Sequence, residues 1–355
     1  MSKPTVLVQG TGLIGTSLGL ALKAQDWTVH LHDVNKQALQ QAVALRAGIA
    51  DQPNPSDVDL VVVCVPPAVT VDVVRASLDE FRAAVVTDVA SLKEHIILQI
   101  SDHPSAQRFV GGHPMAGREL SGPTGARSDL FEARPWVLTP SEGQDQQRRT
   151  VEDLVSSVGA NLVVMDARDH DTSVALTSHL PQILASAMAA RLTDADPASL
   201  VLTGQGLRDV TRIAASDPLL WGQIVQGNAQ AIAQVLGQVI ADLTSLQESL
   251  SDGGADAFDV AQALIAAGQV GHSKIPGKHG SSAQRYANVS VVIPDEPGAL
   301  AQLFQAVGEL GVNIEDLLLE HSPGQPVGLA TLYVAPASAQ TLFSGLQASG
   351  WVVYR

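Results

Sequence analysis

The sequence is poor in cysteine and in positive charge, and it lacks a long hydrophobic run. Its one cysteine, Cys64, excludes an intrachain disulfide and a cysteine-based metal cluster. Lysine and arginine number 21 against 36 aspartates and glutamates, a formal net charge of −15, so we expect no nucleic-acid partner. No apolar stretch approaches the length of a membrane span without a break, so we expect no membrane contact and a cytoplasmic protein.

Strand-like and helix-like patterns alternate over residues 1–165. The strand-like apolar runs are Thr5–Val8, Trp27–His32, Leu60–Val65, Ala84–Asp88, Phe109–Gly112, Trp136–Leu138 and Leu162–Val164. Strands that alternate with helices are typical of right-handed crossovers in an α/β fold. We therefore predict a Rossmann-like, doubly wound parallel sheet for this first domain.

The pattern changes twice after this domain. Strand signals disappear over 166–271, and densely apolar helical patterns predict an all-helical substrate and dimerisation domain, hence a homodimer. Residues 272–284 are rich in Gly, Ser, Lys and His and predict a linker. Residues 285–355 alternate in the order β-α-β-β-α-β, which predicts a small α+β ferredoxin-like domain.

A glycine motif indicates a dinucleotide site. Gly10, Gly12 and Gly15 have G-x-G-x-x-G spacing, enclose Leu13 and Ile14, follow the first strand and open the first helix. The glycines permit a tight turn, close approach of a diphosphate and close helix packing. Asp33 ends the second strand and suits the ribose hydroxyls of NAD rather than a 2′-phosphate. We also expect contacts from Val65 and Pro66, after the third strand.

Four further strings carry a family resemblance. They are TDVASLK at 87–93, GHPMAGRE at 112–119, SHLP at 178–181 and GLRDVTRIA at 206–214. Together they resemble the prephenate/arogenate dehydrogenase family over residues 5 to about 250. The strings DEPGAL at 295–300 and LGVNI at 310–314 resemble an ACT domain, a small amino-acid-sensing module.

The resemblance implies NAD-dependent oxidation and decarboxylation of prephenate, or of its amino analogue arogenate, on the route to tyrosine. The family's catalytic histidine falls on His113, placed in a loop after the strand that ends at Gly112, and a neutral imidazole suits a proton acceptor. By resemblance Ser91 orients His113 and the substrate hydroxyl. Ser91 could equally cap the helix that we expect to begin near Leu92.

Anchors for the substrate carboxylates should come from the helical domain. Arg212 is our candidate, because a guanidinium matches a carboxylate with two parallel hydrogen bonds. Asp209, three residues earlier, would then fix the guanidinium, although a plain surface pair is the alternative. Glu119 resembles an acidic residue at the mouth of the family's pocket, and the alternative is an exposed loop glutamate.

Histidines of the helical domain also match family positions. His170 and His179 do so, and His179 is either a substrate contact or a buried histidine at a helix start. The family commonly has a second histidine three residues after His179, where this chain has Gln182. Glutamine cannot carry charge near neutral pH, so the choice between prephenate and arogenate stays open.

The ACT resemblance implies an amino-acid effector, most plausibly tyrosine. We expect it near the turn of Asp295 and Gly298 and near Asn313 and Ile314, where exposed amides suit a carboxylate. The alternative is a domain that only helps the chain to dimerise.

Two rival functions remain, and no metal site is expected. Some other NAD-dependent hydroxyacid dehydrogenases use a lysine on a helix of their second domain, but residues 166–250 contain none. A non-catalytic NAD or amino-acid sensor would need no proton acceptor such as His113. No H-E-x-x-H or C-x-x-C motif is present.

Overall fold

The computed structural model describes residues 3–118, 120, 122–251, 254, 256–276, 286–321 and 326–354. The chain forms two compact units, Met1–Ile240 and Ala241–Arg355. Within the described residues, no helix combines the length and the apolar character needed to cross a membrane.

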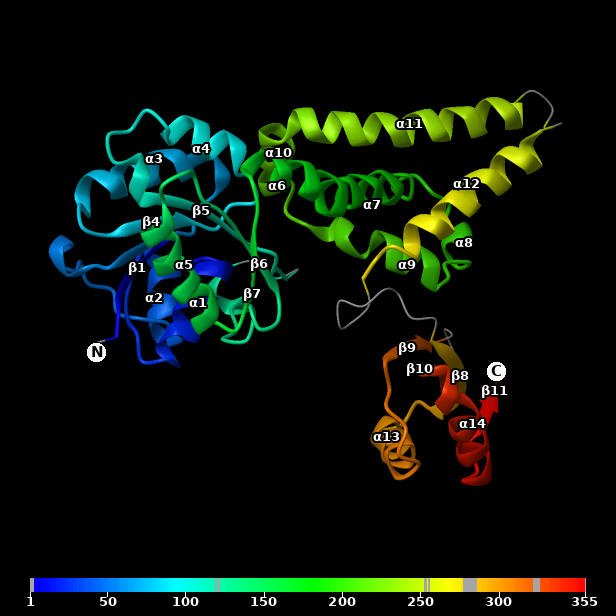
Figure 1. Ribbon diagram of the computed structural model, residues 1–355. Helices are drawn as coiled ribbons and strands as arrows, with labels where there is room; N and C mark the ends of the chain where they lie inside the picture. Colours follow the sequence, from blue (N-terminus) through cyan, green and yellow to red (C-terminus); the bar gives the residue numbers. More distant parts are fainter. Residues whose placement is uncertain are drawn as a thin grey trace. The chain divides into compact units, whose positions relative to one another are not determined.

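A seven-stranded sheet in the order β2-β1-β3-β4-β5-β6-β7 organises the first unit (Figure 1). Its strands are β1 (Thr5–Gln9), β2 (Thr28–His32), β3 (Leu60–Val63), β4 (Val85–Asp88), β5 (Phe109–Pro114), β6 (Pro135–Thr139) and β7 (Asn161–Val164). The first five strands are parallel, while β6 pairs antiparallel with β5 and parallel with β7. The chain leaves β1 for β2 on one side and reaches β3 on the other, which opens a crevice at their carboxyl ends.

Helices cover both faces of this sheet, as predicted for a doubly wound fold. They are α1 (Leu13–Lys23), α2 (Lys36–Ala44) and α5 (Asp145–Ser157) on one face, and α3 (Pro67–Glu80) and α4 (Glu94–Ile100) on the other. Leu18, Leu22 and Trp136 are fully buried on the first face, and Val61, Val74 and Ile96 on the second. Because both faces are covered, the central strands are continuous hydrophobic runs.

The remainder of the first unit is helical, with two breaks that the sequence pattern did not predict. Its elements are α6 (Ala167–Val174), the π-helical turn η4 (Ala175–His179), α7 (Leu180–Ala190), α8 (Pro197–Leu200), α9 (Gln205–Thr211), the 3-10 helix η5 (Arg212–Ala215), α10 (Pro218–Gly227) and the start of α11 (Ala229–Ser251). The first break is η4, between α6 and α7. The second is Asn228, between α10 and α11, whose side-chain amide donates to the carbonyl of Asp171. A Cβ at Gly227 would lie 2.2 Å from Leu92, so this glycine allows close packing there.

The second unit contains the end of α11, α12 (Ala257–His272) and a four-stranded antiparallel sheet in the order β11-β8-β10-β9. Its strands and helices are β8 (Ala287–Pro294), α13 (Ala299–Glu309), β9 (Asp316–His321), β10 (Val327–Val334), α14 (Ala339–Ala348) and β11 (Val352–Tyr354). The predicted order β-α-β-β-α-β is therefore confirmed. Val291, Leu303 and Leu332 lie in the core between sheet and helices. Of the expected linker 272–284, His272 ends α12, and residues 277–284 are outside the described part.

Candidate active site

The glycine motif forms the turn between β1 and α1. Gly10 has φ +98°, and a Cβ there would lie 2.3 Å from the carbonyl oxygen of Cys64. A Cβ on Gly15 would lie 1.9 Å from the carbonyl oxygen of Gly10, so neither position tolerates a side chain. A Cβ on Gly12 would meet nothing within 4 Å, so the space in front of α1 is open. Leu13 and Ile14 begin α1, and their N–H groups precede the first intrahelical bond, from Thr16 to Gly12.

Asp33 lies beside this turn and is oriented by it. One carboxylate oxygen accepts the amide of Thr11 at 2.6 Å and its hydroxyl at 2.9 Å, and the other accepts the amide of Asn35 at 2.7 Å. A carboxylate can accept about four bonds, so capacity for a ribose hydroxyl remains. Val65 approaches Gly10 from the end of β3, and Pro66 caps α3. These residues fit a bound dinucleotide: open helix N–H groups for the diphosphate and an acid for the ribose.

His113 lies inside β5 and is 9% exposed. The sequence-based placement in a loop after a strand ending at Gly112 was wrong. Antiparallel pairing with β6 extends β5, with His113 opposite Val137 and Pro114 opposite Trp136. Because a strand fixes its backbone more firmly than a loop does, the imidazole is held by the sheet itself.

A buried ion pair holds the residue before His113. Lys93 and Asp88 are both fully buried and bonded to each other. The ammonium of Lys93 also donates to the carbonyl of Gly112 at 2.7 Å, and Asp88 accepts the amide of Gly112 at 3.1 Å. Burial lowers the pKa of Lys93, and the attraction of Asp88 opposes that shift. Both backbone polar groups of Gly112 are thus bonded to charged side chains.

A chain of hydrogen bonds connects His113 to α6. His170 Nε2 lies 2.8 Å from His113 Nδ1, and His170 Nδ1 lies 2.7 Å from Asp171 Oδ1. A carboxylate only accepts, so His170 carries its proton on Nδ1 and accepts through Nε2. His113 must then donate from Nδ1, which leaves Nε2 unprotonated. The arrangement therefore sets the tautomer that a proton acceptor needs.

Burial keeps His113 in this neutral form. The pKa of His113 lies well below 6.5, first because of burial and then because of His170, Lys93 and His179. Asp171 also accepts the amides of Lys93 and Glu94, both at 2.9 Å, and so caps α4 from another helix. These amides fix the orientation of the carboxylate that bonds to His170.

His179 is buried at the start of α7, and burial lowers its pKa from 6.5 to about 4. Its Nδ1 lies 3.2 Å from the amide of Asn228, which also donates to the carbonyl of Asp171 at 2.7 Å. Its Nε2 is buried and has no hydrogen-bond partner in the described part of the chain. Trp221 lies edge-on to its ring at 6.0 Å. The Nε2 atom of His179 is thus a polar group enclosed by the protein without a hydrogen-bond partner among the described residues.

The other predicted substrate residues are less closely grouped. Gln182 is buried in α7, donates to the carbonyl of Ile213 at 3.0 Å and lies 3.3 Å from the hydroxyl of Ser216. It therefore ties α7 to η5, the turn that begins with Arg212. Asp209 accepts Gln205 at 2.7 Å within α9. Glu119 lies outside the described residues.

Ser91 lies in the turn between β4 and α4 and is partly exposed. The expectation that it caps α4 was wrong, because α4 begins at Glu94 with Lys93 as its cap residue. No hydrogen bond joins Ser91 to His113 in the described residues. The described residues also contain no cluster of three or more histidine, cysteine or acidic side chains arranged for a metal ion.

Sequence analysis missed three residues of this site: Asp88, Asp171 and Asn228. Asp88 ends a strand within the string TDVASLK, which was a usable signal. Asp171 directly follows His170, but nothing local shows that its carboxylate reaches α4. Asn228 gave only a weak signal, an amide directly after Gly227 within an apolar helical pattern.

The expected effector residues lie on either side of α13. Asp295 and Gly298 precede α13, whereas Asn313 and Ile314 follow it. The helix has 11 residues, which places its ends about 16 Å apart at 1.5 Å per residue. Gly298 has φ +93° at the start of α13, and Asn313 donates to Glu315 at 2.8 Å.

Comparisons with known proteins agree with this geometry. The family model "prephenate dehydrogenase, nucleotide-binding domain" matches residues 18–164, and "prephenate dehydrogenase, dimerization domain" matches residues 166–264. A probable prephenate dehydrogenase of Streptomyces niveus is 36% identical, with 98% of each chain covered. A cyclohexadienyl dehydrogenase of Zymomonas mobilis is 33% identical over 69% of this chain and 88% of its own.

A solved structure of a similar protein contains the cofactor NAD+. The prephenate dehydrogenase of Aquifex aeolicus, crystallised with hydroxyphenyl propionate and NAD+, matches with a TM-score of 0.66 and 25% identity, covering 76% of this chain and 98% of its own. The nucleotide-binding model and the turn at Gly10 to Gly15 likewise indicate NAD. The chain belongs to the prephenate dehydrogenase family and is an NAD-dependent dehydrogenase.

Proposed function

We propose that the chain oxidises and decarboxylates prephenate with NAD, giving 4-hydroxyphenylpyruvate, carbon dioxide and NADH. The observation that carries the proposal is the chain of hydrogen bonds from Asp171 through His170 to His113. It leaves His113 Nε2 unprotonated next to the carboxyl edge of a sheet that carries a dinucleotide turn. A proton acceptor beside a hydride acceptor is what this reaction requires.

Each residue of the site has a separate role in the proposed reaction. NAD would supply the acceptor for the hydride that leaves the ring carbon bearing the hydroxyl. His113 Nε2 takes the hydroxyl proton as the bond between the ring and its carboxylate breaks and carbon dioxide leaves. The electron pair of that bond makes the ring aromatic, and His113 returns the proton to the phenolate oxygen. Asp171 and His170 keep His113 in the required tautomer. The bonds of Lys93 and Asp88 to Gly112 fix the backbone next to His113. Ser91 supplies a hydroxyl at the edge of the same site.

Arg212 anchors a substrate carboxylate in this proposal. Gln182 ties η5 to α7, so Arg212 starts from a fixed turn. A guanidinium on a fixed backbone loses less conformational freedom on binding a carboxylate. Asp209 contributes a charge near this anchor, and His179 is the candidate for a neutral contact with the substrate.

Arogenate is the second candidate substrate. The cyclohexadienyl dehydrogenase relative and a structural match to an arogenate dehydrogenase from Synechocystis, with 26% identity and a TM-score of 0.60, favour keeping it. Arogenate carries an ammonium where prephenate has a keto group. Gln182 cannot supply charge for either, so its effect on preference is a matter for measurement.

Tyrosine is the proposed effector, and the C-terminal sheet domain is the proposed ACT module. Its topology and the left-handed Gly298 at the start of α13 support this assignment. Because Gly298 and Asn313 lie at opposite ends of α13, the effector site would form between two chains. Tyrosine that changes neither activity nor the melting temperature would exclude the assignment.

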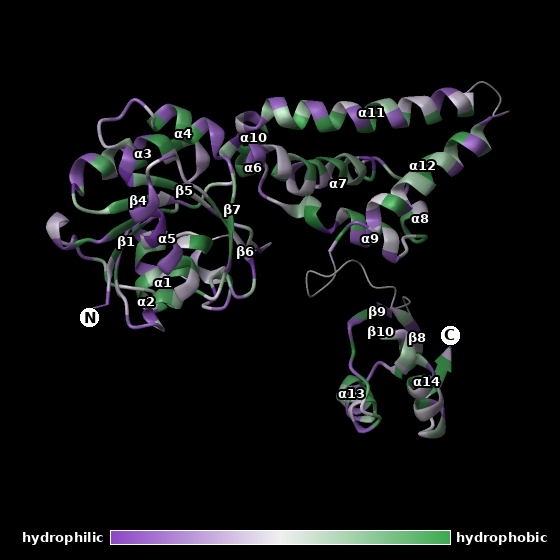
Figure 2. Cartoon of the chain, viewed as in Figure 1, coloured by the Kyte–Doolittle hydropathy of each residue, from purple (hydrophilic) through white to green (hydrophobic). Residues whose placement is uncertain are grey.

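A homodimer is the proposed assembly. The dimerization-domain model covers 166–264. Large apolar side chains are exposed in this region, among them Leu202 at 86% in the turn after α8, Leu219 at 73% in α10 and Phe258 at 74% in α12. Hydrophobic residues recur along α11 and α12 (Figure 2). Apolar surface of this extent is typical of a subunit interface, and light scattering would measure the mass in solution.

The reaction is tested by following NADH absorbance with NAD and prephenate or arogenate, each with and without tyrosine. Faster turnover of prephenate supports the proposal, and faster turnover of arogenate replaces it with the second candidate. No turnover of either substrate, with NAD bound, would exclude both.

A further inference from the structure

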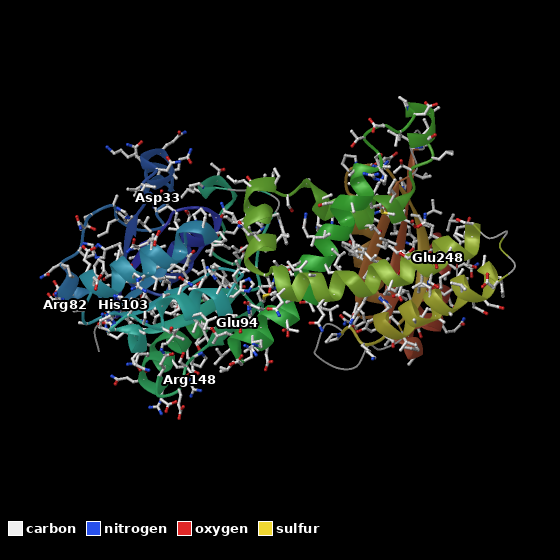
Figure 3. All side chains as sticks on the ribbon, turned by 90° about the horizontal axis from the view of Figure 1, so that it is seen from above. Asp33, Arg82, Glu94, His103, Arg148 and Glu248 are labelled. Carbon is white, nitrogen blue, oxygen red and sulfur yellow. The ribbon has the colours of Figure 1, made fainter. Side chains whose placement is uncertain are left out.

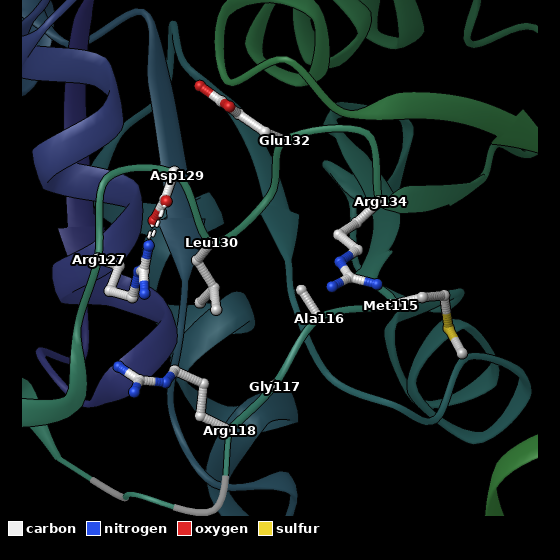
Figure 4. Close-up of a pocket in the computed structure, with 9 residues that line it drawn as sticks. All are labelled: Met115, Ala116, Gly117, Arg118, Arg127, Asp129, Leu130, Glu132 and Arg134. Atoms are coloured by element: carbon white, nitrogen blue, oxygen red, sulfur yellow. Dashed lines mark hydrogen bonds and ion pairs between the residues drawn. The ribbon is translucent and has the colours of Figure 1, made fainter. Parts of the chain in front are cut away.

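A cavity of about 470 Å³ lies beside the loop that follows His113. Its walls are Met115, Ala116, Gly117, Arg118, Arg127, Asp129, Leu130, Glu132 and Arg134 (Figure 4). Three of these nine residues are arginines, in a chain with only 21 basic residues and a net charge of −15. Two carboxylates oppose them, so the lining carries a net charge of +1.

Each of the three arginines keeps N–H donors that no described residue accepts, so these donors can bind a ligand. Arg127 uses Nε, 2.7 Å from Asp129, and Nη2 for one carboxylate, which leaves Nη1. Arg118 donates from Nη1 to the carbonyl of Gly125 at 2.8 Å, and its other donors have no partner among the described residues. The guanidinium of Arg134 makes no hydrogen bond or ion pair within the described part of the chain, although its backbone bonds to Phe131 and Asn161. Figure 4 shows Arg134 directed toward Ala116, while Glu132 points away from the centre.

The cavity lies between the two halves of the candidate site. On one side the amide of Arg127 donates to Ser17 in α1 at 3.0 Å. Ser17 is four residues after the start of α1, about 6 Å along a helix that rises 1.5 Å per residue. On the other side lies Met115, two residues after His113. Its amide donates to the carbonyl of Pro135 at 2.8 Å. The loops that line the cavity are therefore joined to α1 on one side and follow β5 on the other.

We infer that this cavity is an oxyanion subsite, in which Arg118, Arg127 and Arg134 bind a phosphate or carboxylate group of a ligand held in the site. Guanidinium groups match both oxyanions with paired hydrogen bonds. The two sources are the cofactor diphosphate and a carboxylate of the substrate, so the inference deepens the proposed function.

Arg134→Gln is the main test, because that side chain has no partner to lose among the described residues. The probes are NAD alone and prephenate added to the NADH complex, which cannot accept a hydride, both measured by titration calorimetry. We expect one dissociation constant to rise about three- to tenfold, the effect of one weakened charge-assisted hydrogen bond. A rise for NAD identifies the diphosphate, and a rise for prephenate alone identifies the carboxylate. Arg134→Lys, which keeps the charge, should recover part of the loss.

Arg82→Gln is the matched control. Arg82 is an exposed arginine before β4, at the amino ends of the parallel strands, whereas the candidate site lies at their carboxyl ends. Figure 3 shows Arg82 at the periphery. Equal affinities of Arg134→Gln, Arg82→Gln and the unaltered protein for both probes would overturn the inference. Because binding is measured without turnover, an inactive protein that still binds prephenate would contradict the proposed reaction but not the subsite.

Discussion

His113 Nδ1 lies 2.8 Å from His170 Nε2, although 57 residues separate the two histidines. His113 belongs to β5 of the nucleotide-binding sheet, and His170 belongs to α6, the first helix after it. Asp171 binds both His170 and the start of α4. The proposed proton acceptor therefore depends on how the helices after the sheet pack against α4.

His113→Asn should lower kcat about 10²- to 10⁴-fold, the usual range for a lost general base. The asparagine amide can still donate to His170, so the fold and the dinucleotide turn should persist. NADH formation measures turnover, and calorimetry with NAD measures cofactor binding. Turnover within threefold of the unaltered protein would exclude His113 as the proton acceptor.

Asp171→Asn should lower kcat about 10- to 100-fold and the free energy of unfolding by about 1–3 kcal/mol. One carboxylate oxygen becomes an amide donor, which conflicts with the amide of Glu94 in one orientation, or with the amide of Lys93 and the ring of His170 in the other. Asp169→Asn, an exposed neighbour in α6, is the matched control and should change neither quantity. Equal kcat values for the two variants would show that Asp171 does not position His113.

The pH dependence of kcat/KM should follow the low pKa of His113. Burial favours the neutral imidazole, so the free enzyme should keep its proton acceptor below pH 6.5. We expect kcat/KM to stay level as the pH falls through 6.5 and to decline only in more acid solution. An acid limb centred at or above pH 6.5 would contradict this prediction.

Lys93→Met should lower the free energy of unfolding by about 3–5 kcal/mol, because Asp88 would remain as a buried charge without its cation. The double variant Lys93→Met with Asp88→Asn should recover part of the loss. Denaturant unfolding measures both. The exposed Lys23→Met is the control and should stay within about 0.5 kcal/mol of the unaltered protein. A single variant as stable as this control would disprove the role of the pair.

His179 should make the protein less stable as the pH falls from 6.5 to about 4. Its pKa is about 4 in the fold against 6.5 ordinarily, so the unfolded chain binds the extra proton first. The stabilisation is complete above pH 6.5 and is lost toward pH 4. His179→Gln should make the decline of the melting temperature shallower, especially above pH 5 where carboxylates contribute little. The exposed His95→Gln should leave the slope unchanged.

The sequence by itself determined the order of elements and the cofactor turn. Apolar runs such as Leu60–Val63 predict strands buried on both faces, and Gly10, Gly12 and Gly15 have few conformations open to them. The C-terminal order β-α-β-β-α-β followed from alternation alone. These features depend on neighbours within a few residues, so a linear pattern contains them.

The tertiary structure decided the proton acceptor's surroundings. The pairing of β6 with β5 put His113 into a strand, and only packing brought Asp171 to both His170 and the start of α4. The contact of His113 with His170 joins residues 57 positions apart, and that of Asp171 with Lys93 joins residues 78 positions apart. The strength of such contacts depends on burial, which no local pattern of residues specifies.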